Sequence, residues 1–382
     1  MSTQAHIPFN RPYVAPNTMK YVEEALKSNH QQGGGFLNSK ATELVKKISG
    51  GGETFLTASC TQALEMATML LDLKPGDEVI MPSFTFTSAA TALANYGVIP
   101  VFVDIEPTHL NIDPNKVRDA ITPRTKAISI VNYAGNACDF AALDEIAKEF
   151  GLLKIEDNAH GFGVSSNGRK LGTWGDVATL SFHATKNIQC GEGGALTVNN
   201  PEYVDRAHIL QEKGTNRRMF EKGQVLKYRW VDKGGSFLIS EVTSAMLLAQ
   251  LENYNSIQES RRKTFNWYAK IFEELNINNN LKTISFDAVD ASHIFWILLT
   301  GENREVFIKQ MSSFNIQVTS HYEALHASPA GGELSKCFGN LKHTNKVVSN
   351  IVRLPIWAGM TLFDLEYIKT SLEKSFKKMG II

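Results

Sequence analysis

The sequence predicts an α/β fold built on a mostly parallel sheet. Between about residues 54 and 200, short apolar or β-branched runs alternate with segments of helical spacing and with turn residues, which is typical of parallel sheets. Since 43% of the 382 residues are hydrophobic, the chain can bury a core large enough for one large and one smaller domain. The seven expected strands are Thr54–Thr57, Val79–Met81, Val101–Asp104, Ala127–Asn132, Leu152–Glu156, Ala178–Phe182 and Ala195–Val198.

Helical patterns separate these runs and dominate the second half of the chain. Thr61–Leu73 has apolar residues at helical spacing, and Lys74–Asp77 supplies a stop and a turn. We expect residues 1–250 to form the large domain with an N-terminal arm, and residues 251–382 to form a small α+β domain. The later elements expected are helices at Ile239–Asn253, Gln258–Leu275 and Arg304–Ser312, a loop at 276–280, and a strand at Ile294–Leu299.

The charge balance excludes several classes of partner. The 39 basic and 39 acidic residues cancel, so the chain has no overall attraction for nucleic acid or an anionic membrane. It has neither an apolar run near the roughly 20 residues that span a bilayer nor a secretory signal at the N-terminus, so we expect a cytoplasmic protein. We expect no metal site and reduced thiols in or near the core, because the four cysteines are scattered (Cys60, Cys138, Cys190, Cys337).

Lys186 is the first candidate for chemistry. It follows the expected strand Ala178–Phe182, among small polar residues and before Gly191–Gly194. A lysine in such a pocket can form a Schiff base with an aldehyde, and pyridoxal 5′-phosphate (PLP) is a cofactor of that type. A lysine at a strand end can equally be a solvated surface residue.

Asp157 is the second candidate, at the end of another apolar strand. A PLP enzyme needs a carboxylate against the pyridine nitrogen, because a protonated ring withdraws electrons. The alternative is that Asp157 caps the next helix or turn. His160 follows within the same segment and can contact the cofactor ring or be an ordinary core histidine.

A phosphate site is the third candidate. Ala58–Leu64 is a turn of small polar residues between a strand and a helix, and free N–H groups at a helix N-terminus bind phosphate. The alternative is simple capping of the helix by Ser59 or Thr61.

Together these segments resemble a known family. Ser-Cys-Thr-Gln-Ala-Leu, Pro-Ser-Phe-Thr-Phe, Glu-Asp-x-Ala-His and Ser-Phe-His-x-Thr-Lys-Asn with Gly-Glu-Gly-Gly occur in the order of the DegT/DnrJ/EryC1/StrS-type sugar aminotransferases, which are fold-type I PLP enzymes. The resemblance implies a seven-stranded, mostly parallel sheet between helices. Three further segments, at 212–217, 227–230 and 321–326, resemble enzymes that aminate dTDP-4-dehydro-6-deoxy-D-glucose.

The resemblance implies roles for individual residues. Lys186 would bind the cofactor and shuttle the proton, and Asp157 would pair with the pyridinium nitrogen. Relatives that dehydrate the sugar carry histidine at the lysine position, so Lys186 favours amino transfer. The other cofactor contacts implied are His160 near the phenolic oxygen, Phe86 on the ring face, and Thr61, Gln62 and Ser181 on the phosphate.

The resemblance also implies a homodimer with shared active sites. Many relatives place an asparagine from one subunit on the partner's cofactor phosphate, whereas this chain has the shorter Ser236 there. L-glutamate would be the amino donor and a dTDP-linked keto-deoxysugar the acceptor, with the product used for O-antigen and lipopolysaccharide. Candidates for the sugar nucleotide are Gly34, whose backbone approaches the sugar or forms a flexible turn, and Lys213, Arg217, Arg229, His321, Tyr322 and His326.

Three other functions are weighed against this one. A 3-ketosugar transaminase would share all of these motifs. A non-catalytic nucleotide-sugar-binding protein is disfavoured, because Lys186 and Asp157 are both present. A nicotinamide dehydrogenase is disfavoured by the lack of a Gly-x-Gly-x-x-Gly motif after the early strands.

Overall fold

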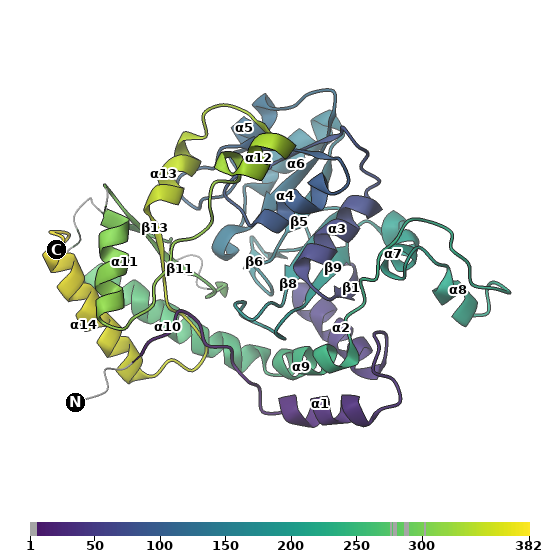
Figure 1. Ribbon diagram of the computed structural model, residues 1–382, viewed down its shortest axis with the longest axis horizontal. Coiled ribbons are helices and arrows are strands. Elements are labelled where there is room, and N and C mark those ends of the chain that lie inside the picture. Colours follow the sequence, from purple (N-terminus) through teal and green to yellow (C-terminus); the bar gives the residue numbers. More distant parts are fainter. Residues whose placement is uncertain (1–5, 276, 278–280, 286–289, 302) are drawn as a thin grey trace.

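The computed structural model describes residues 6–275, 277, 281–285, 290–301 and 303–382. Strands from the first half of the chain gather into one large sheet with helices around it, and a smaller group of helices and strands lies beside it (Figure 1). The predicted α/β class is confirmed. Apart from residue 277, the loop expected at 276–280 lies outside the described residues.

The large sheet contains all seven expected strands and one more. Seven of its eight strands run in the same direction, and β9 is antiparallel to its two neighbours, β1 and β8. The extra strand, β12, has two residues and pairs with β3, so it is too short to show a pattern in the sequence. In spatial order the strands are β1 (Glu53–Thr57), β9 (Gly194–Val198), β8 (Val177–Ser181), β5 (Leu153–Asp157), β4 (Thr125–Val131), β2 (Glu78–Pro82), β3 (Ile99–Val103) and β12 (Lys336–Cys337).

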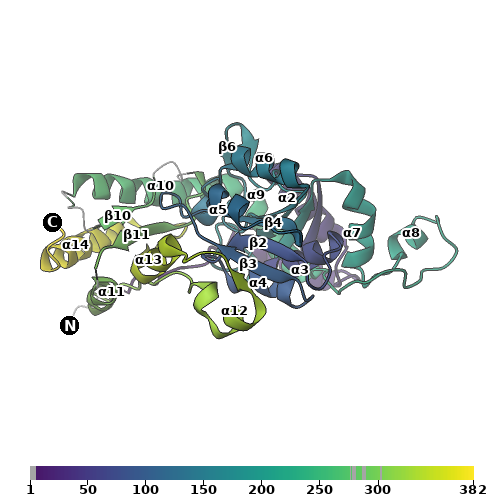
Figure 2. The same cartoon turned by 90° about the horizontal axis from the view of Figure 1, so that it is seen from above.

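Helices cover both faces of this sheet, as Figure 2 shows. Alternate residues of a strand point to opposite faces, so Val79 and Met81 of β2 pack into one core layer and Ile80 into the other. The first layer includes α3 (Cys60–Leu70), α4 (Thr87–Ala94) and α7 (Val204–Gln211), and the second includes α5 (Pro114–Asp119) and α6 (Phe140–Phe150). A third layer under β1, β9 and β8 is built from α1 (Thr18–Lys27), α2 (Phe36–Ser49) and α9 (Glu241–Glu252).

The C-terminal part has its own sheet and core. Helix α10 (Tyr254–Glu274) leads from α9 to an antiparallel sheet of β10 (Leu281–Thr283), β11 (Phe295–Leu299) and β13 (Ile351–Leu354). The predicted division after residue 250 falls inside α9 and stays a prediction. The remaining elements are α8 (Arg217–Glu221), α11 (Asn303–Ser313), α12 (Pro329–Leu334), α13 (Lys342–Asn350), α14 (Leu362–Lys378) and the hairpin β6 (Ser165–Ser166) with β7 (Arg169–Lys170).

The N-terminal arm and one of the cysteines each show a feature that the sequence did not predict. The N-terminal arm begins on the C-terminal part, where Ile7 forms a β-bridge with Ile316. All four cysteines are free, but Cys337 is exposed on the edge strand β12 and is therefore not near the core. None of the described helices has the length and apolarity needed to cross a membrane.

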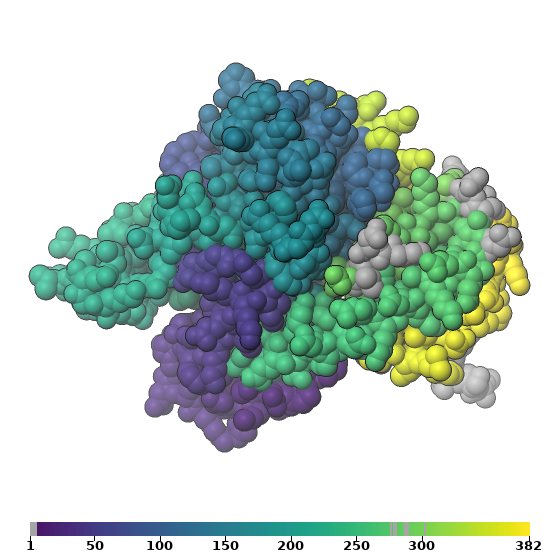
Figure 3. Space-filling model, turned by 180° about the vertical axis from the view of Figure 1, so that it is seen from behind, coloured from purple at the N-terminus to yellow at the C-terminus, as the bar shows by residue number. Residues whose placement is uncertain are grey.

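Residues 212–236 form an arm that projects from the body of the protein. Its base is joined by the β-bridges Glu212–Ser236 and Thr215–Trp230, and its outer part carries α8. Figure 3 shows this arm as the teal protrusion away from the compact body. It exposes large apolar side chains, among them Leu226 at 97% and Trp230 at 81% of their surface.

The glycines at 33–35 bring the chain against the start of α9. A β-carbon on Gly33 would lie 2.5 Å from the Ile239 carbonyl oxygen, and one on Gly35 would lie 2.5 Å from the Glu241 carboxyl carbon. Glu241 is buried and accepts hydrogen bonds from the N–H groups of Gly35, Leu37 and Asn38, so it caps α2 from another helix. These glycines therefore serve a close contact within the protein.

We expect Gly33→Ala to destabilise the protein by about 1–3 kcal/mol, because the added methyl group must displace the backbone at Ile239. The free energy of unfolding in urea measures this effect. The matched control is Gly332→Ala in α12, whose β-carbon would meet no atom within 4 Å and which should leave stability unchanged or slightly higher. Equal stability of the two variants would contradict the packing assigned to Gly33.

Candidate active site

A cavity of about 830 Å³ opens at the carboxyl edge of the large sheet. Asp157 is the last residue of β5, and Ser181 is the last residue of the neighbouring parallel strand β8. Carboxyl ends of parallel strands share one edge, and ligands of α/β sheets bind there. Both side chains line the cavity, as Lys186 and the first turn of α3 do.

The first turn of α3 reaches the cavity because β9 has a glycine beneath it. A β-carbon on Gly194 would lie 2.4 Å from the Cys60 nitrogen. Ser59 is the N-cap and accepts a hydrogen bond from the Gln62 N–H at 3.1 Å, as the capping alternative proposed. Thr61 Oγ1 lies 2.7 Å from Ser88 Oγ, and both hydroxyls face the cavity. The turn therefore combines a helix N-terminus with hydroxyl groups, which suits a phosphate.

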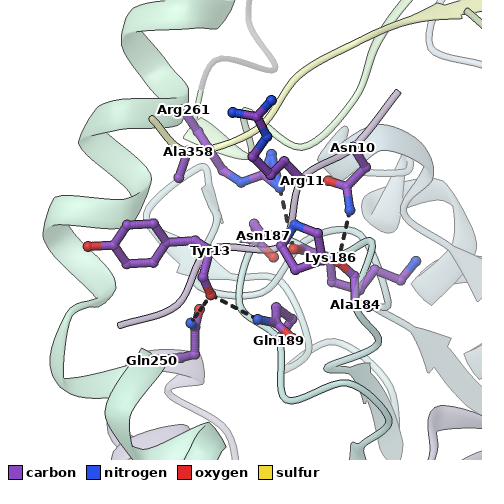
Figure 4. A pocket seen from close by; sticks show the side chains of 11 residues that line it. Asn10, Arg11, Tyr13, Ala184, Lys186, Asn187, Gln189, Gln250, Arg261 and Ala358 are labelled. Carbon is purple, nitrogen blue, oxygen red and sulfur yellow. Dashed lines mark hydrogen bonds between the residues drawn. The ribbon is translucent and has the colours of Figure 1, made fainter. Parts of the chain in front are cut away.

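Lys186 lies on the loop between β8 and β9, and its backbone is held from several sides. Its N–H donates to the His183 carbonyl at 2.8 Å, and Arg261 Nη2 donates to its carbonyl at 3.4 Å. Asn10 Nδ2 donates to the Ala184 carbonyl at 3.0 Å, so the N-terminal segment fastens the same loop (Figure 4). Figure 4 also shows Gln189 and Gln250 bound to the Tyr13 carbonyl.

Burial changes the acid–base properties of both central groups. It lowers the pKa of Lys186 to about 8, against the opposing effects of Cys60 and Asp157. Burial also raises the pKa of Asp157, although the Ala159 N–H and the nearby Lys186 act in the other direction. A lysine with a pKa near neutrality is a competent nucleophile and base.

Aromatic and imidazole rings form the wall opposite the sheet. His160 Nδ1 accepts from the Ala134 N–H at 3.2 Å, so a neutral ring carries its proton on Nε2, which lies 3.2 Å from Tyr322 Oη. His321 Nδ1 lies 2.6 Å from Tyr133 Oη. Burial lowers the pKa of His160 and of His321 well below the usual range, with contributions from Lys186 and Arg353. Both rings are therefore neutral near pH 7.

Comparison with known proteins assigns the family. The model of the DegT/DnrJ/EryC1/StrS aminotransferase family matches residues 12–373. GDP-perosamine synthase of Caulobacter vibrioides is 32% identical over 322 residues, which cover 82% of this chain and 83% of that protein. The uncharacterised protein MJ1066 of Methanocaldococcus jannaschii is 30% identical over 385 residues, or 98% of each chain. The chain belongs to the DegT/DnrJ/EryC1/StrS aminotransferase family.

Membership makes the chain a PLP-dependent sugar aminotransferase, as its motifs predicted. Among solved structures, PseC of Helicobacter pylori, an aminotransferase involved in pseudoaminic acid biosynthesis, has the same fold with a TM-score of 0.88. It is 23% identical, and the match covers 98% of this chain and 100% of that one.

The residues at the cavity of this aminotransferase fit the chemistry of PLP. They include an amine, a buried carboxylate, a helix N-terminus with hydroxyl groups, and Phe86, a large apolar ring that is 58% exposed. The amine suits the aldehyde of PLP, and the carboxylate suits its pyridine nitrogen. The helix N-terminus suits its phosphate, and the apolar ring suits the face of its pyridine ring. In the part of the chain that the structure describes, no group of three or more histidine, cysteine or acidic residues is arranged to hold a metal.

The cavity unites eight of the residues that the sequence singled out. They are Thr61, Phe86, Asp157, His160, Ser181, Lys186, His321 and Tyr322. The structure shows the surroundings of two of the sugar-nucleotide candidates. His321, a candidate for the diphosphate, is buried, neutral and hydrogen-bonded within the wall. Gly34, a candidate for a sugar contact or a flexible turn, has a positive φ and no atom within 4 Å of an added β-carbon, while Gly33 and Gly35 on either side of it contact the start of α9, so its role stays a prediction.

The other expected residues lie outside this cavity. Gln62 directs its side-chain oxygen to the Ala58 N–H, and His326 Nδ1 lies 2.7 Å from Ser83 Oγ, with burial lowering the pKa of His326. Four more are in the 212–236 arm: Lys213, Arg217, Arg229 and Ser236. Arg217 Nε is 2.8 Å from Glu221 and the Arg229 N–H donates to Asn216, so both residues make contacts within the arm.

Some residues at the cavity were not anticipated, Ser88, His293 and Arg353 among them. Ser88 follows the recognised Pro-Ser-Phe-Thr-Phe run, which was the available signal. His293 and Arg353 come from the C-terminal part, and no local pattern marks either of them. Arg353 lies in β13, far along the chain from every cofactor motif.

We expect the apo-enzyme to capture PLP with a rate that rises with pH and levels off above about pH 8. The pKa of Lys186 is about 8, so the reactive neutral amine is fully formed there, whereas an ordinary lysine would continue to gain reactivity beyond pH 10. Stopped-flow absorbance measures the rate. A free lysine derivative, followed over the same pH range, corrects for titration of the cofactor. A rate that keeps rising through pH 10 would refute the lowered pKa.

Proposed function

We propose that this enzyme transfers the amino group of L-glutamate to C4 of dTDP-4-dehydro-6-deoxy-D-glucose. The product would be a dTDP-4-amino-4,6-dideoxyhexose of galacto or gluco configuration, used for O-antigen or lipopolysaccharide biosynthesis. The enzyme would act in the cytoplasm. The observation that carries this proposal is the common cavity of Lys186, Asp157 and the first turn of α3. The relative named GDP-perosamine synthase supports a nucleotide-linked sugar, and the segments at 212–217, 227–230 and 321–326 favour dTDP.

Each part of the proposed chemistry has a residue in the cavity region that is suited to it. PLP, when bound, stabilises negative charge on the carbon from which a proton is removed. Asp157 holds the ring nitrogen in its charged form, and burial of this carboxylate strengthens the pair. Thr61, Gln62 and Ser181 hold the phosphate, the first two mainly through backbone N–H groups. Phe86 would cover one ring face, and His160 would lie near the phenolic oxygen.

Lys186 moves the proton. In the first half-reaction it takes the proton from the amino-bearing carbon of L-glutamate. In the second half-reaction it delivers a proton to the sugar carbon that receives the amino group. Its lowered pKa gives a larger neutral fraction near pH 7 than an ordinary lysine has, and the neutral amine can accept a proton. The contacts from Asn10 and Arg261 hold the backbone around it, which keeps the amine directed at the same atoms in both half-reactions.

The 212–236 arm supports a homodimer with shared active sites. Its exposed apolar residues, including Leu226, Tyr228 and Trp230, need a covering surface. We assign that surface to the second subunit, so that Lys213, Arg217, Arg229 and Ser236 act at the partner's active site. The three cationic residues would bind the diphosphate of the sugar nucleotide there, and Ser236 would contact the cofactor phosphate.

The alternative acceptor is a sugar with the ketone at C3, since the residues that move the proton would be the same. Incubation with each of the two dTDP-keto sugars and NMR of the products distinguishes the carbon that is aminated. Amination at C3 alone would replace the C4 assignment but retain the enzyme class.

We expect Lys186→Ala to lower transamination of the 4-keto sugar by at least about 10⁴-fold, because no other lysine lines the cavity formed by the described residues. L-glutamate should then fail to change the absorbance of the bound cofactor. Lys154→Ala is the control, since Lys154 pairs with Asp144 outside the cavity and its loss should leave the rate unchanged. Parental activity in Lys186→Ala would rule out the proposed mechanism.

A second prediction tests the shared sites. Lys186→Ala and Arg229→Ala should each be inactive or nearly so, and mixing them after partial unfolding should restore about a quarter of the parental activity. Half of the reassembled dimers then carry one site with both native residues. If Arg229 served its own subunit's site, the hybrid would have no intact site, and mixing would restore nothing.

A further inference from the structure

Thr179 places a buried hydroxyl group beside Asp157. The two residues are Cα partners on the parallel strands β8 and β5, so their side chains lie on the same face of the sheet. The Asn158 N–H donates to the Thr179 carbonyl at 3.0 Å and holds this register. Thr179 is fully buried and does not line the cavity, so its hydroxyl can act on a ligand only through a neighbouring side chain.

The Thr179 hydroxyl is not used elsewhere in the part of the chain that the structure describes. Thr179 Oγ1 forms no hydrogen bond of good geometry there, which is costly for a buried polar atom. It nevertheless lies close enough to affect the carboxylate. Burial raises the pKa of Asp157, and the Ala159 N–H, the Lys186 charge and the Thr179 hydroxyl act in the other direction.

The neighbouring thiol leaves the proton of this hydroxyl to the carboxylate. Cys60, the first residue of α3, is affected by the same hydroxyl. Burial and the charge of Asp157 raise the pKa of Cys60 to about 12, so the thiol stays protonated near pH 7. A protonated thiol is a weak acceptor, whereas a carboxylate accepts several hydrogen bonds. The Thr179 O–H is therefore available to donate to Asp157.

A second donor on Asp157 affects the proton between this carboxylate and a pyridine nitrogen. Burial strengthens the attraction within such a pair but also penalises its two charges, so the proton can lie on the nitrogen or on the carboxylate. Asp157 Oδ1 already accepts from the Ala159 N–H at 3.1 Å. A further hydrogen bond favours the charged carboxylate, and with it the protonated ring that withdraws electrons.

The hydroxyl differs in one respect from the other neighbours that act on Asp157. Lys186 lowers the pKa of Asp157 only while its amine is charged. A hydroxyl has no charge to lose, so its effect on the carboxylate is the same in both half-reactions. Thr179 is thus suited to a constant adjustment of the ring nitrogen, while Lys186 exchanges protons.

We propose that Thr179 is a positioning residue that donates a hydrogen bond to Asp157 and thereby keeps the ring nitrogen of the bound cofactor protonated. This proposal rests on the role given to Asp157 in the proposed function. Because both half-reactions use the same ring, loss of the hydroxyl should slow both by the same factor, about tenfold. The KM values for L-glutamate and the keto sugar should stay unchanged.

Titration of two ligands into the apo-enzyme tests this role without turnover. 4′-Deoxypyridoxine 5′-phosphate has the ring nitrogen and the phosphate but no aldehyde, so Lys186 cannot form a bond to it. By calorimetry, Thr179→Val should bind it about tenfold more weakly than the parent, because a hydrogen bond to a charged group is lost. Inorganic phosphate, which has no ring, should bind both proteins equally.

Thr197→Val is the matched control for these measurements. Thr197 Oγ1 is also buried and without a hydrogen bond to the described residues, but Thr197 is paired with Thr54 and Ala178, not with Asp157. This variant should bind both ligands as the parent does. If Thr179→Val does not fold, Thr179→Ala removes the same hydroxyl without added bulk, and the same losses are expected.

The ring nitrogen gives a second readout, which a purely structural role would not change. NMR of the bound cofactor, labelled with nitrogen-15 in the ring, reports whether that nitrogen carries a proton. We expect a protonated nitrogen in the parent and in Thr197→Val, and a partly unprotonated one in Thr179→Val. Thr179→Ser keeps the hydroxyl and should restore the parental signal and affinity.

Parental affinity and a fully protonated ring nitrogen in Thr179→Val would overturn the role of Thr179. An equal loss of affinity for inorganic phosphate would also overturn it, since the defect would then lie in the α3 turn. Asp157→Asn distinguishes this failure from that of the proposed function. If the ring nitrogen stays protonated in Asp157→Asn, the role of Asp157 in the proposed function is wrong, and that of Thr179 falls with it.

Discussion

The burial of the Lys186 amine is the condition on which the site depends. An amine in water has a pKa near 10.5, whereas burial, with a contribution from Arg353, lowers the pKa of Lys186 to about 8 against the opposing effects of Cys60 and Asp157. Burial requires a closed loop, and the loop is closed by residues from distant parts of the chain, Asn10 and Arg261. The N-terminal segment and helix α10 therefore contribute to the acid–base chemistry of a residue that neither contains.

The parts of the site that follow from strand ends could be predicted from the sequence. Asp157 and Ser181 are the last residues of parallel strands, and a run of apolar residues followed by a polar one marks such an end. The turn at Thr61, which we propose binds the cofactor phosphate, could be recognised because a strand, small polar residues and a helix follow one another. In each case the chemistry and the local structure lie within one short segment.

Other residues could not be predicted, because their roles depend on contacts between distant segments. His321 is a polar residue in sequence, and burial in the folded protein, together with Arg353, His160 and Lys186, lowers its pKa and makes it neutral. Gly33 and Gly35 fit a flexible turn, a ligand contact or a close helix contact equally well until the position of α9 is known. Arg353 lies in a short apolar strand, and a single arginine there gives no indication that the chain folds to place it at the same cavity as Lys186.

The two-residue strand β12 has a consequence for the protein's behaviour in a crowded cell. An exposed sheet edge is a template on which strands of other molecules can add, and proteins counter this with short or charged edge strands. Here β12 covers the end of β3 and carries Lys336, whose amine lies 2.6 Å from the buried carboxylate of Glu78. The edge is thus brief, charged and anchored to the sheet interior, which protects this side of the protein against aggregation.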